Sequence, residues 1–546
     1  MSCALVAVIV LAGCSPAWIE RVNVATDGTQ ADHPTFTGGA ISGDGRYVAF
    51  SSFATTLVPG DTNGANDVFV RDNLTGTTER VSVGSDESQA DSPAGAHAGS
   101  AVDISPDGRF VLFHASFNDL VPGSPPGNLV YLRDRVAGTT EIVSLPDDDS
   151  AAKGGIAGGV SADGRYVSFV SNASNLVAGD TNGDPPCDLH EPYCDIHGHD
   201  VFVRDRVADT TERVSVADDE TQSDRGSGHI GVSDNGRYVA FVSPATNLVP
   251  NDTNDGTDIF VRDRLTGATE LVSVALDGTS PNRESFFGSL SADGRYVTFM
   301  SPATDLVPGD PGDPFVDRHI YLRDRVAGLT ERVDVSTAGT LGNRLTEPDS
   351  SVSADGRYVV FASFADDLVP GDTNGASDVF LRDRLLGTLE RVSLNHLGQQ
   401  ADDASPPPAL ASSFVPSISD DGHYVAFSSQ ADNLVPGDTN GVVTDVFARF
   451  VLLPVVDDAS PPTVGAGRST LTVSGARFLP GVAVTVSGGG VTVDDFTRLD
   501  ESTLLVDVTV AADAAPGVRA IRVVNEGTGP GADASGSNLC WCLNVT

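Results

Sequence analysis

Lysine is nearly absent from this chain, and basic residues as a whole are scarce. Lys153 is the only lysine, and 33 basic residues stand against 75 acidic ones, which gives a net charge of −42. A surface of this charge repels phosphate backbones and anionic membranes, so nucleic acid is excluded as an expected partner. The same charge favours cations and basic surfaces, or it serves only to keep the protein soluble.

Long hydrophobic runs and common catalytic motifs are also missing. The one sustained apolar run, residues 4–13, is too short to span a bilayer. No Gly-x-Ser-x-Gly, His-Glu-x-x-His or Gly-x-x-x-x-Gly-Lys motif occurs, so the usual hydrolase, zinc-protease and nucleotide-binding signatures are absent. Gly, Pro and Asp interrupt every stretch that could form a long helix.

The apolar run ends in Leu11-Ala12-Gly13-Cys14, which resembles the signal of a bacterial lipoprotein. This resemblance implies that residues 1–14 direct export and that Cys14 carries a lipid. We therefore expect a protein anchored in the cell envelope by lipid, or one that is periplasmic or secreted.

A repeated unit builds most of the chain, and residues 353–394 are a clear copy of it. Residues 357–361, 378–381 and 390–394 are short, rich in β-branched and aromatic residues, and separated by turn residues, as is typical of strands. Small residues at 351–353 predict a further, innermost strand. Each copy is therefore expected to form four antiparallel strands.

A Ser-x-Asp/Asn-Gly turn marks each copy. It occurs at Asp44, Asp107, Asp163, Asn235, Asp293, Asp355 and Asp421. Seven copies predict an all-β fold, a seven-bladed β-propeller over residues 20–453. The last copy lacks its outer strand, and residues 20–24 carry that pattern, so we expect the N-terminal strand to close the last blade.

The repeated pattern SxDGRYVxFxS…DVFVRDRxxGxTERVSV resembles the TolB-type, WD-like β-propeller repeats of bacterial envelope proteins. The resemblance covers about four-fifths of the chain. It implies the fold but not one activity, because that superfamily includes scaffolds, peptidase gating domains and lyases.

The repeat stops before a different C-terminal segment. Residues 454–462, PVVDDASPP, have the composition of a linker. Residues 463–546 predict closely spaced strands of a small immunoglobulin-like β-sandwich. The elements G-x-x-F-x-P-G and A-P-G-x-R-x-I-x-V resemble an IPT/TIG-type domain, which implies a role in spacing or adhesion.

Acidic loops are the first candidate site. Asp-Thr-Asn, followed by a further Asp, recurs at Asp61/Asn63/Asp67, Asp180/Asn182/Asp200, Asp252/Asn254/Asp258, Asp372/Asn374/Asp378 and Asp438/Asn440/Asp445. Oxygen ligands at alternate positions of a turn suit Ca²⁺, the one cofactor we expect. The alternative is a turn capped by the side chain of its own Asp or Asn.

An insertion in the third copy is the second candidate. Cys187 and Cys194 lie within it, and an exported protein favours a disulfide between them. A transition-metal site on His190, His197 and His199 is the alternative.

Two further sets of charged residues remain. Arg-Asp pairs such as Arg71-Asp72 recur in nearly every copy, which predicts a structural role between blades and in turns. Residues found in one copy only are better candidates for binding a ligand near the axis. They are His97, His229, Arg283, Glu284, Arg318, His319 and Glu347.

Together these patterns predict an exported binding or scaffold protein rather than an enzyme. The long loops between second and third strands, and between outer and next inner strands, lie on one face of a propeller, where an envelope protein or a glycan would bind. The alternative is an enzyme that acts on a polysaccharide or glycoside at the axial pocket.

Overall fold

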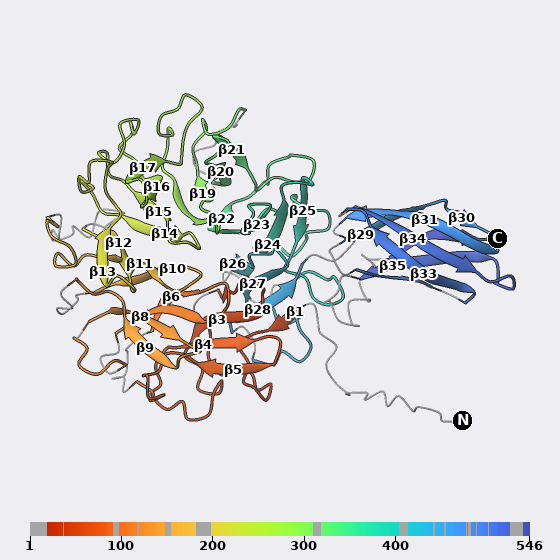
Figure 1. Cartoon of the computed structure of the whole chain (residues 1–546), viewed down its shortest axis with the longest axis horizontal. Coiled ribbons are helices and arrows are strands. Elements are labelled where there is room, and N and C mark those ends of the chain that lie inside the picture. The colour runs from red at the N-terminus through yellow and green to blue at the C-terminus, as the bar shows by residue number, and fades with distance from the viewer. Residues whose placement is uncertain are drawn as a thin grey trace. The chain divides into compact units, whose positions relative to one another are not determined.

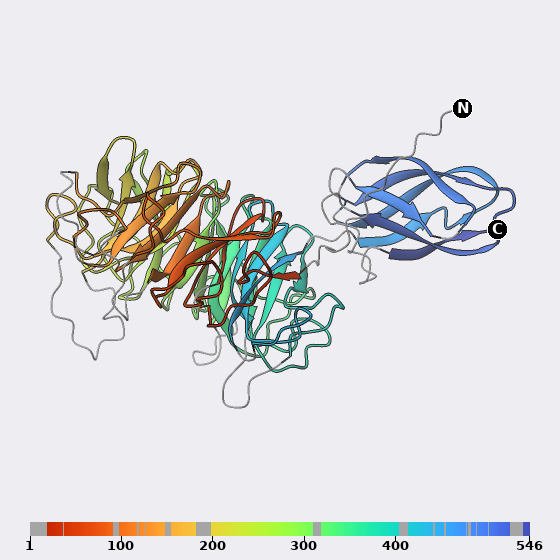
Figure 2. The same ribbon diagram turned by 90° about the horizontal axis from the view of Figure 1, so that it is seen from below.

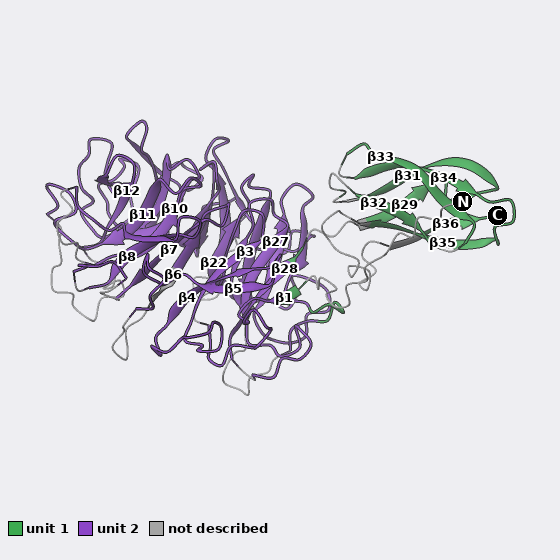
Figure 3. Cartoon of the chain, turned by 60° about the horizontal axis from the view of Figure 1, so that its bottom comes forward, with its two compact units in different colours: residues 1–20, 395–399, 450–546 green, residues 21–394, 400–449 purple. Residues whose placement is uncertain are grey.

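The computed structural model describes residues 19–35, 38–90, 98–116, 120–125, 127–147, 154–181, 198–309, 318–402, 413–440, 443–451, 455–476, 478, 482–487, 489–500, 502–524 and 539–546. The chain divides into two compact units (Figure 3): residues 21–394 with 400–449, and residues 450–546 with 1–20 and 395–399. Every regular element within the described ranges is a strand, as Figure 2 also shows.

Seven four-stranded sheets carry the repeats. Their first strands are β2 (Ala40–Ile41), β6 (Ala98–Ile104), β10 (Ile156–Val160), β14 (Gly228–Val232), β18 (Phe286–Leu290), β22 (Thr346–Val352) and β26 (Ser413–Ile418). Their second strands are β3 (Tyr47–Ser52), β7 (Phe110–Ala115), β11 (Tyr166–Ser171), β15 (Tyr238–Ser243), β19 (Tyr296–Ser301), β23 (Tyr358–Ser363) and β27 (Tyr424–Ser429). Their third strands are β4 (Asp67–Asp72), β8 (Leu129–Asp134), β12 (Asp200–Asp205), β16 (Asp258–Asp263), β20 (His319–Asp324), β24 (Asp378–Asp383) and β28 (Asp445–Phe450). Their outer strands are β5 (Thr77–Arg80), β9 (Thr139–Ile142), β13 (Thr210–Arg213), β17 (Ala268–Leu271), β21 (Leu329–Arg332), β25 (Thr388–Arg391) and β1 (Ile19–Arg21).

We number these sheets in chain order. Sheets 1 to 6 are β2–β5, β6–β9, β10–β13, β14–β17, β18–β21 and β22–β25, and sheet 7 is β26–β28 with β1. First strands of successive sheets contact one another in order, and β26 contacts β2 again. They lie nearest the centre in Figure 1, with the outer strands at the rim. This closed ring of sheets is a β-propeller, as the repeats predicted.

Each sheet is built around the same buried contacts. In sheet 6 the rings of Phe361 and Phe380, from the second and third strands, stack with centroids 5.7 Å apart, and both are fully buried.

The glycine of each Asp-Gly turn is needed for two reasons: its φ is positive, and an aromatic ring of the neighbouring sheet leaves no space for a side chain. Gly45 has a φ of +73°, and a Cβ on it would lie 2.1 Å from the ring of Tyr424 in sheet 7.

Sheet 7 is completed by the two ends of the repeat region. β1 lies beside β28, as predicted, and the Val22 nitrogen donates to the Val446 carbonyl at 2.7 Å. Asn23 Nδ2 donates to Asp445 Oδ1 at 2.7 Å, across 422 positions of sequence. The β1 segment therefore covers an edge that β28 would otherwise expose.

The smaller unit contains two four-stranded sheets that share one apolar core. One consists of β29 (Val455–Ser460), β31 (Gly467–Ala476), β34 (Thr503–Val510) and β33 (Val491–Arg498). The other consists of β30 (Thr463–Val464), β36 (Leu539–Val545), β35 (Gly517–Val524) and β32 (Ala483–Val486). Leu471, Val506, Val523 and Leu543 are fully buried in the core.

The linker predicted at residues 454–462 is wrong for most of that segment. β29 pairs with β31 and buries Val456 and Ala459 in the core. The pairing register shifts between Val456 and Asp458, so both buried residues face the core although they are three positions apart. The Asp and Pro content of the segment is nevertheless typical of a linker.

Candidate functional site

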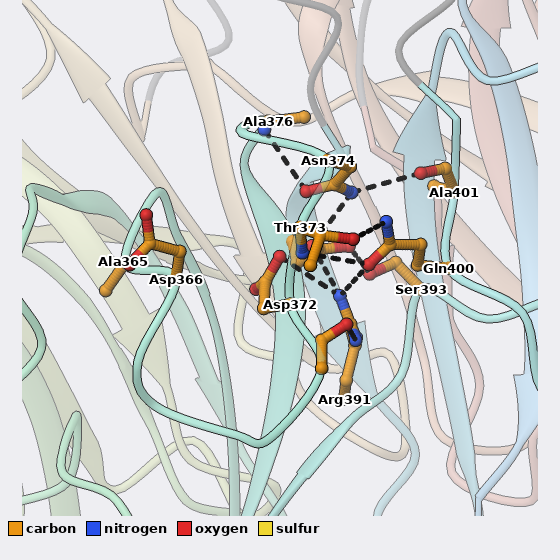
Figure 4. Close-up of polar contacts among 12 residues, drawn as sticks. Ala365, Asp366, Asp372, Thr373, Asn374, Ala376, Arg391, Ser393, Gln400 and Ala401 are labelled. Atoms are coloured by element: carbon orange, nitrogen blue, oxygen red, sulfur yellow. Dashed lines mark hydrogen bonds and ion pairs between the residues drawn. The ribbon is translucent and has the colours of Figure 1, made fainter.

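The acidic loop of sheet 6, drawn in Figure 4, brings two carboxylates onto one arginine. Arg391 comes from the outer strand, and its Nη1 lies 3.2 Å from Asp372 Oδ1 and 3.2 Å from Asp378 Oδ2. All three side chains are buried. The guanidinium therefore lies where a cation bound by the two carboxylates would lie.

Asn374, the middle residue of the motif, shapes this loop. Its Oδ1 accepts from the Ala376 nitrogen at 3.2 Å, which is a turn of the kind that the sequence offered as the alternative to calcium. Its Nδ2 donates to Asp378 Oδ2 and to the Ala401 carbonyl, both at 3.0 Å. The loop is thereby joined to the segment that follows the outer strand.

Asn63 and Asn440 also bond to the protein itself. Asn63 Oδ1 accepts from the Ala65 nitrogen at 3.0 Å, and its Nδ2 donates to the Ala90 carbonyl at 3.4 Å. Asn440 Nδ2 donates to Asp445 Oδ1 at 3.2 Å. Asn63 thus shapes its loop as Asn374 does, and coordination of calcium by Asn63 or Asn440 stays a prediction.

Gln400 strengthens the junction in sheet 6. Its Nε2 donates to Thr373 Oγ1 at 2.9 Å, and its Oε1 accepts from Arg391 Nη1 at 3.0 Å (Figure 4). The two sets of long loops therefore contact each other through side chains and hold each other in place.

Sheets 1, 3 and 7 repeat the arginine bridge. The ion pairs are Arg80 with Asp61 at 3.4 Å and Asp67 at 3.6 Å, Arg213 with Asp180 and Asp200 at 3.4 Å each, and Arg21 with Asp438 at 2.6 Å and Asp445 at 3.5 Å. In these loops and in that of sheet 6, an arginine already balances one of the two negative charges that would attract a metal. Calcium binding stays a prediction. Among the acidic loops, these four support it least, because an arginine lies between their carboxylates.

Sheet 4 keeps the acidic loop but lacks the arginine. Leu271 pairs with Phe260 in the same register in which Arg391 pairs with Phe380. Burial, together with the neighbouring carboxylate, raises the pKa of Asp258 to about 7. Burial also raises the pKa of Asp252 to about 6.

The Arg-Asp pairs have the structural role that the repeat predicted. In sheet 2, Asp134 accepts two hydrogen bonds from Arg109, at 2.9 and 2.6 Å, which hold the pKa of that carboxyl at about 2. The adjacent Arg133 instead donates to the Gly84 carbonyl of the preceding sheet at 3.2 Å. The aspartate of the pair stabilises its own sheet, and the arginine joins two neighbouring sheets.

The two described histidines among the residues predicted near the axis lie in separate sheets, where His229 is half-buried and His319 is buried. His229 Nε2 lies 2.7 Å from Ser168 Oγ of the neighbouring sheet, and burial lowers the pKa of His229 to about 4. His319 Nδ1 lies 2.9 Å from Asp334 Oδ2. Both side chains therefore contribute to packing.

The other predicted ligand residues lie at different exposures. Arg283 and Arg318 are exposed, and Glu284 and Glu347 are half-buried. Burial, followed by the neighbouring Asp349, raises the pKa of Glu347.

Several predicted residues lie outside the described side chains. They are Cys14, His97, Asn182, Cys187, His190, Cys194 and His197. Within the described part of the chain, no group of three or more His, Cys, Asp or Glu side chains is placed to hold a metal ion. Cys542 is disulfide-bonded.

The bridging arginine is the residue that sequence reasoning missed. A signal was present: the outer-strand Arg accompanies the acidic loop in sheets 1, 3, 6 and 7. In sheet 2, where Ile142 takes its place, Leu129 replaces the second aspartate. Arginine and aspartate are thus lost together in sheet 2, whereas sheet 4 keeps both aspartates without the arginine.

Comparisons with known proteins add little beyond the fold. No family model matches the sequence, and no curated protein is significantly similar to it. Among solved structures, a protein described as TolB from Agrobacterium tumefaciens is 16% identical, with a TM-score of 0.32, over 57% of this chain and 86% of its own. A chain of the mitotic checkpoint complex is 11% identical, with a TM-score of 0.39, over 82% of this chain and 99% of its own. A prolyl endopeptidase is 11% identical, with a TM-score of 0.42, over 82% of this chain and 55% of its own.

None of the described residues belongs to a helix of the length and apolarity that crossing a membrane requires.

Proposed function

We propose that this chain is an exported, non-enzymatic binding or scaffold protein whose seven-bladed β-propeller binds an envelope protein or a glycan on its long-loop face. One observation carries the proposal: the polar residues that recur from sheet to sheet bond to one another. The arginine bridges and the Arg-Asp pairs are of this kind. Such residues stabilise the ring and are not available for chemistry.

The internal bonds of the long loops also support binding. Gln222 and Gln400 each accept a hydrogen bond from the threonine nitrogen of the adjacent acidic loop. Loops held in one conformation lose less entropy when a ligand binds. The net charge of −42 favours a partner with a basic surface.

The remaining parts of the proposal rest on the sequence. Residues 1–14 would direct export, Cys14 would attach the protein to a membrane through lipid, and the C-terminal unit, as an IPT/TIG-like domain, would act as a spacer or second contact. Two packed sheets around one core are compatible with that role.

The test is binding of the full chain to purified envelope proteins and a glycan array. One variant carries Asp86→Asn, Asp219→Asn and Asp277→Asn, at exposed turns after the outer strands. A control of equal charge carries Asp44→Asn, Asp107→Asn and Asp293→Asn, in the tight turns on the opposite face, where sheet 4 already has Asn235. We expect the first variant alone to weaken binding several-fold; equal weakening in both would contradict the proposed face.

An enzyme is the second candidate, and one observation favours it. Asp103, Asp234 and Asp420 come from sheets 2, 4 and 7. Burial, followed by the charges of Asp420 and Asp103, raises the pKa of Asp234 to about 6. Paired carboxylates of raised pKa serve glycoside hydrolysis. Polysaccharide cleavage that Asp234→Asn abolishes would establish this function in place of the first.

A further inference from the structure

Sheet 4 contains an acidic loop to which its own outer strand supplies no arginine. Arg225 pairs with the exposed Asp255 of this loop at 3.5 Å, but no arginine among the described residues bridges Asp252 and Asp258. Leu271 occupies the register position of Arg80, Arg213 and Arg391, and it is buried. The loop keeps the turn seen in the other repeats. Asn254 Oδ1 accepts from the Gly256 nitrogen at 2.7 Å, and its Nδ2 donates to the Pro281 carbonyl at 2.7 Å.

The other repeats show that this combination is unusual. In sheets 1, 3, 6 and 7 the outer-strand arginine lies beside the loop and contacts both aspartates. In sheet 5 the arginine is kept as Arg332, but His319 replaces the second aspartate. In sheet 2 both partners are lost, because Ile142 and Leu129 replace the arginine and the second aspartate. Only sheet 4, among the loops that the structure describes, retains both carboxylates and replaces the arginine with an apolar residue.

The carboxylate oxygens of this loop are buried and poorly paired. Asp258 is fully buried, and its Oδ1 accepts from Ser273 Oγ at 2.7 Å. Asp258 Oδ2 and both oxygens of Asp252 have no hydrogen bond of standard geometry among the described residues. Burial raises the pKa of both carboxyls, and apart from the Ser273 bond only weaker contacts oppose it, from Asn254 and Ser280 to Asp252 and from the Asn254 side chain to Asp258. The corresponding oxygen in sheet 6, Asp378 Oδ2, lies 3.2 Å from Arg391.

Charge around the loop deepens the imbalance. Glu284 lies close enough that a Cβ on Gly256 would be 3.3 Å from its Cγ, so a third acidic side chain borders the loop. Two ionised carboxylates buried together without a counter-charge destabilise a fold, so the native protein needs either a cation or a retained proton at this point.

We propose that Asp252 and Asp258 bind one divalent cation of the Ca²⁺ class, at the position that a guanidinium occupies in sheets 1, 3, 6 and 7. The charge of the ion balances two carboxylates. The nearby donors are oxygens, without His or Cys, and such a set selects a hard cation. Water completes the coordination shell. The site is independent of the ligand proposed for the long-loop face.

A shared proton is the competing explanation, because two crowded carboxylates can remain neutral by retaining one hydrogen. The two explanations differ in what they predict for metal. A cation site binds Ca²⁺ at neutral pH, whereas a protonated pair does not.

The experiment is calorimetric titration of the metal-stripped full chain with CaCl2, with MgCl2 as a second probe. An affinity on the order of 10⁻⁴ M suits an extracellular site of this kind. Leu271→Arg, which installs the arginine of the other sheets, is expected to bind one Ca²⁺ fewer than the unaltered chain. Arg391→Leu, which gives sheet 6 the residue of sheet 4, is expected to bind one more.

Asp258→Asn keeps the shape of the side chain and decides the matter if Leu271→Arg does not fold. It is also expected to lose one bound ion. Absence of Ca²⁺ binding by the unaltered chain would overturn the proposal in favour of the shared proton. Unchanged binding by Leu271→Arg or Asp258→Asn would overturn it by placing the ion elsewhere.

Discussion

Sheets 4 and 6 carry the same acidic loop and differ in how its charge is balanced. In sheet 6, Arg391 lies 3.2 Å from each of two aspartates. In sheet 4, Leu271 lies at that register position, and no ion pair to Asp252 or Asp258 is found among the described residues. One residue of the outer strand thus separates a closed structural junction from a candidate cation site. Repeats of one chain act here as controls for each other.

The largest effect should follow from Arg391→Leu, which makes sheet 6 resemble sheet 4. Removal of one partner from a buried ionic cluster typically costs ~3–5 kcal/mol. Urea unfolding in chelator, followed by the near-ultraviolet circular dichroism of the tyrosines, would measure the loss. The exposed Arg283→Leu is the control and should leave the stability nearly unchanged. A similar small change in both variants would mean that the bridge contributes little.

The same substitution should have opposite signs in the two sheets. Asp258 has a folded pKa of about 7, above its ordinary 3.8, so its ionisation destabilises the fold progressively as pH rises from about 4 to 7. Asp258→Asn should therefore stabilise the chelator-treated protein above pH 7, by on the order of 1–4 kcal/mol, and should have little effect near pH 4. Asp378→Asn, which weakens the bond to Arg391, should destabilise it. Thermal melts from pH 4.5 to 8 would compare the two; equal signs would contradict the contrast.

The junction between the two sets of long loops should contribute less. Gln400→Ala removes the bond to Thr373 Oγ1 and one acceptor for Arg391, at an expected cost of ~1 kcal/mol. Ser280 replaces this glutamine in sheet 4 and accepts from the Thr253 nitrogen at 2.9 Å, so Ser280→Ala should cost a similar amount. Urea midpoints measure both. A loss confined to one sheet would show that the two junctions are not equivalent.

The ion pairs between sheets at the rim should contribute least. Glu212 pairs with Arg264 of the next sheet, but about half of the glutamate side chain is exposed. Glu212→Gln should therefore cost ~0–1 kcal/mol, and added salt should reduce the difference. A loss that persists in 1 M salt would indicate a buried role for this pair.

The sequence was informative about the ring because its signals are local. Asp-Gly turns and β-branched runs repeat in every copy, and each lies within one or two neighbouring strands. The latch of residues 20–24 could also be predicted, because one copy lacked a strand and the other end of the chain supplied it.

How charge is balanced in the acidic loops could not be predicted from the sequence in the same way. Asp372 precedes β24, and Arg391 is the last residue of β25. Only the register of these two strands brings the residues together. Composition gave a wrong prediction at residues 454–462, because their Asp and Pro content is typical of a linker although Val456 and Ala459 of β29 are buried. The chemistry of a site was thus harder to predict than the strands that carry it.

The latch also has a consequence for synthesis. Arg21 and Asn23 are the partners of Asp438 and Asp445. They are synthesised first and cannot form these native contacts until the ribosome has made residue 445. Pairing across such a separation is intrinsically slow. The ring can therefore close only after the last strand of the repeat region, β28, has been made.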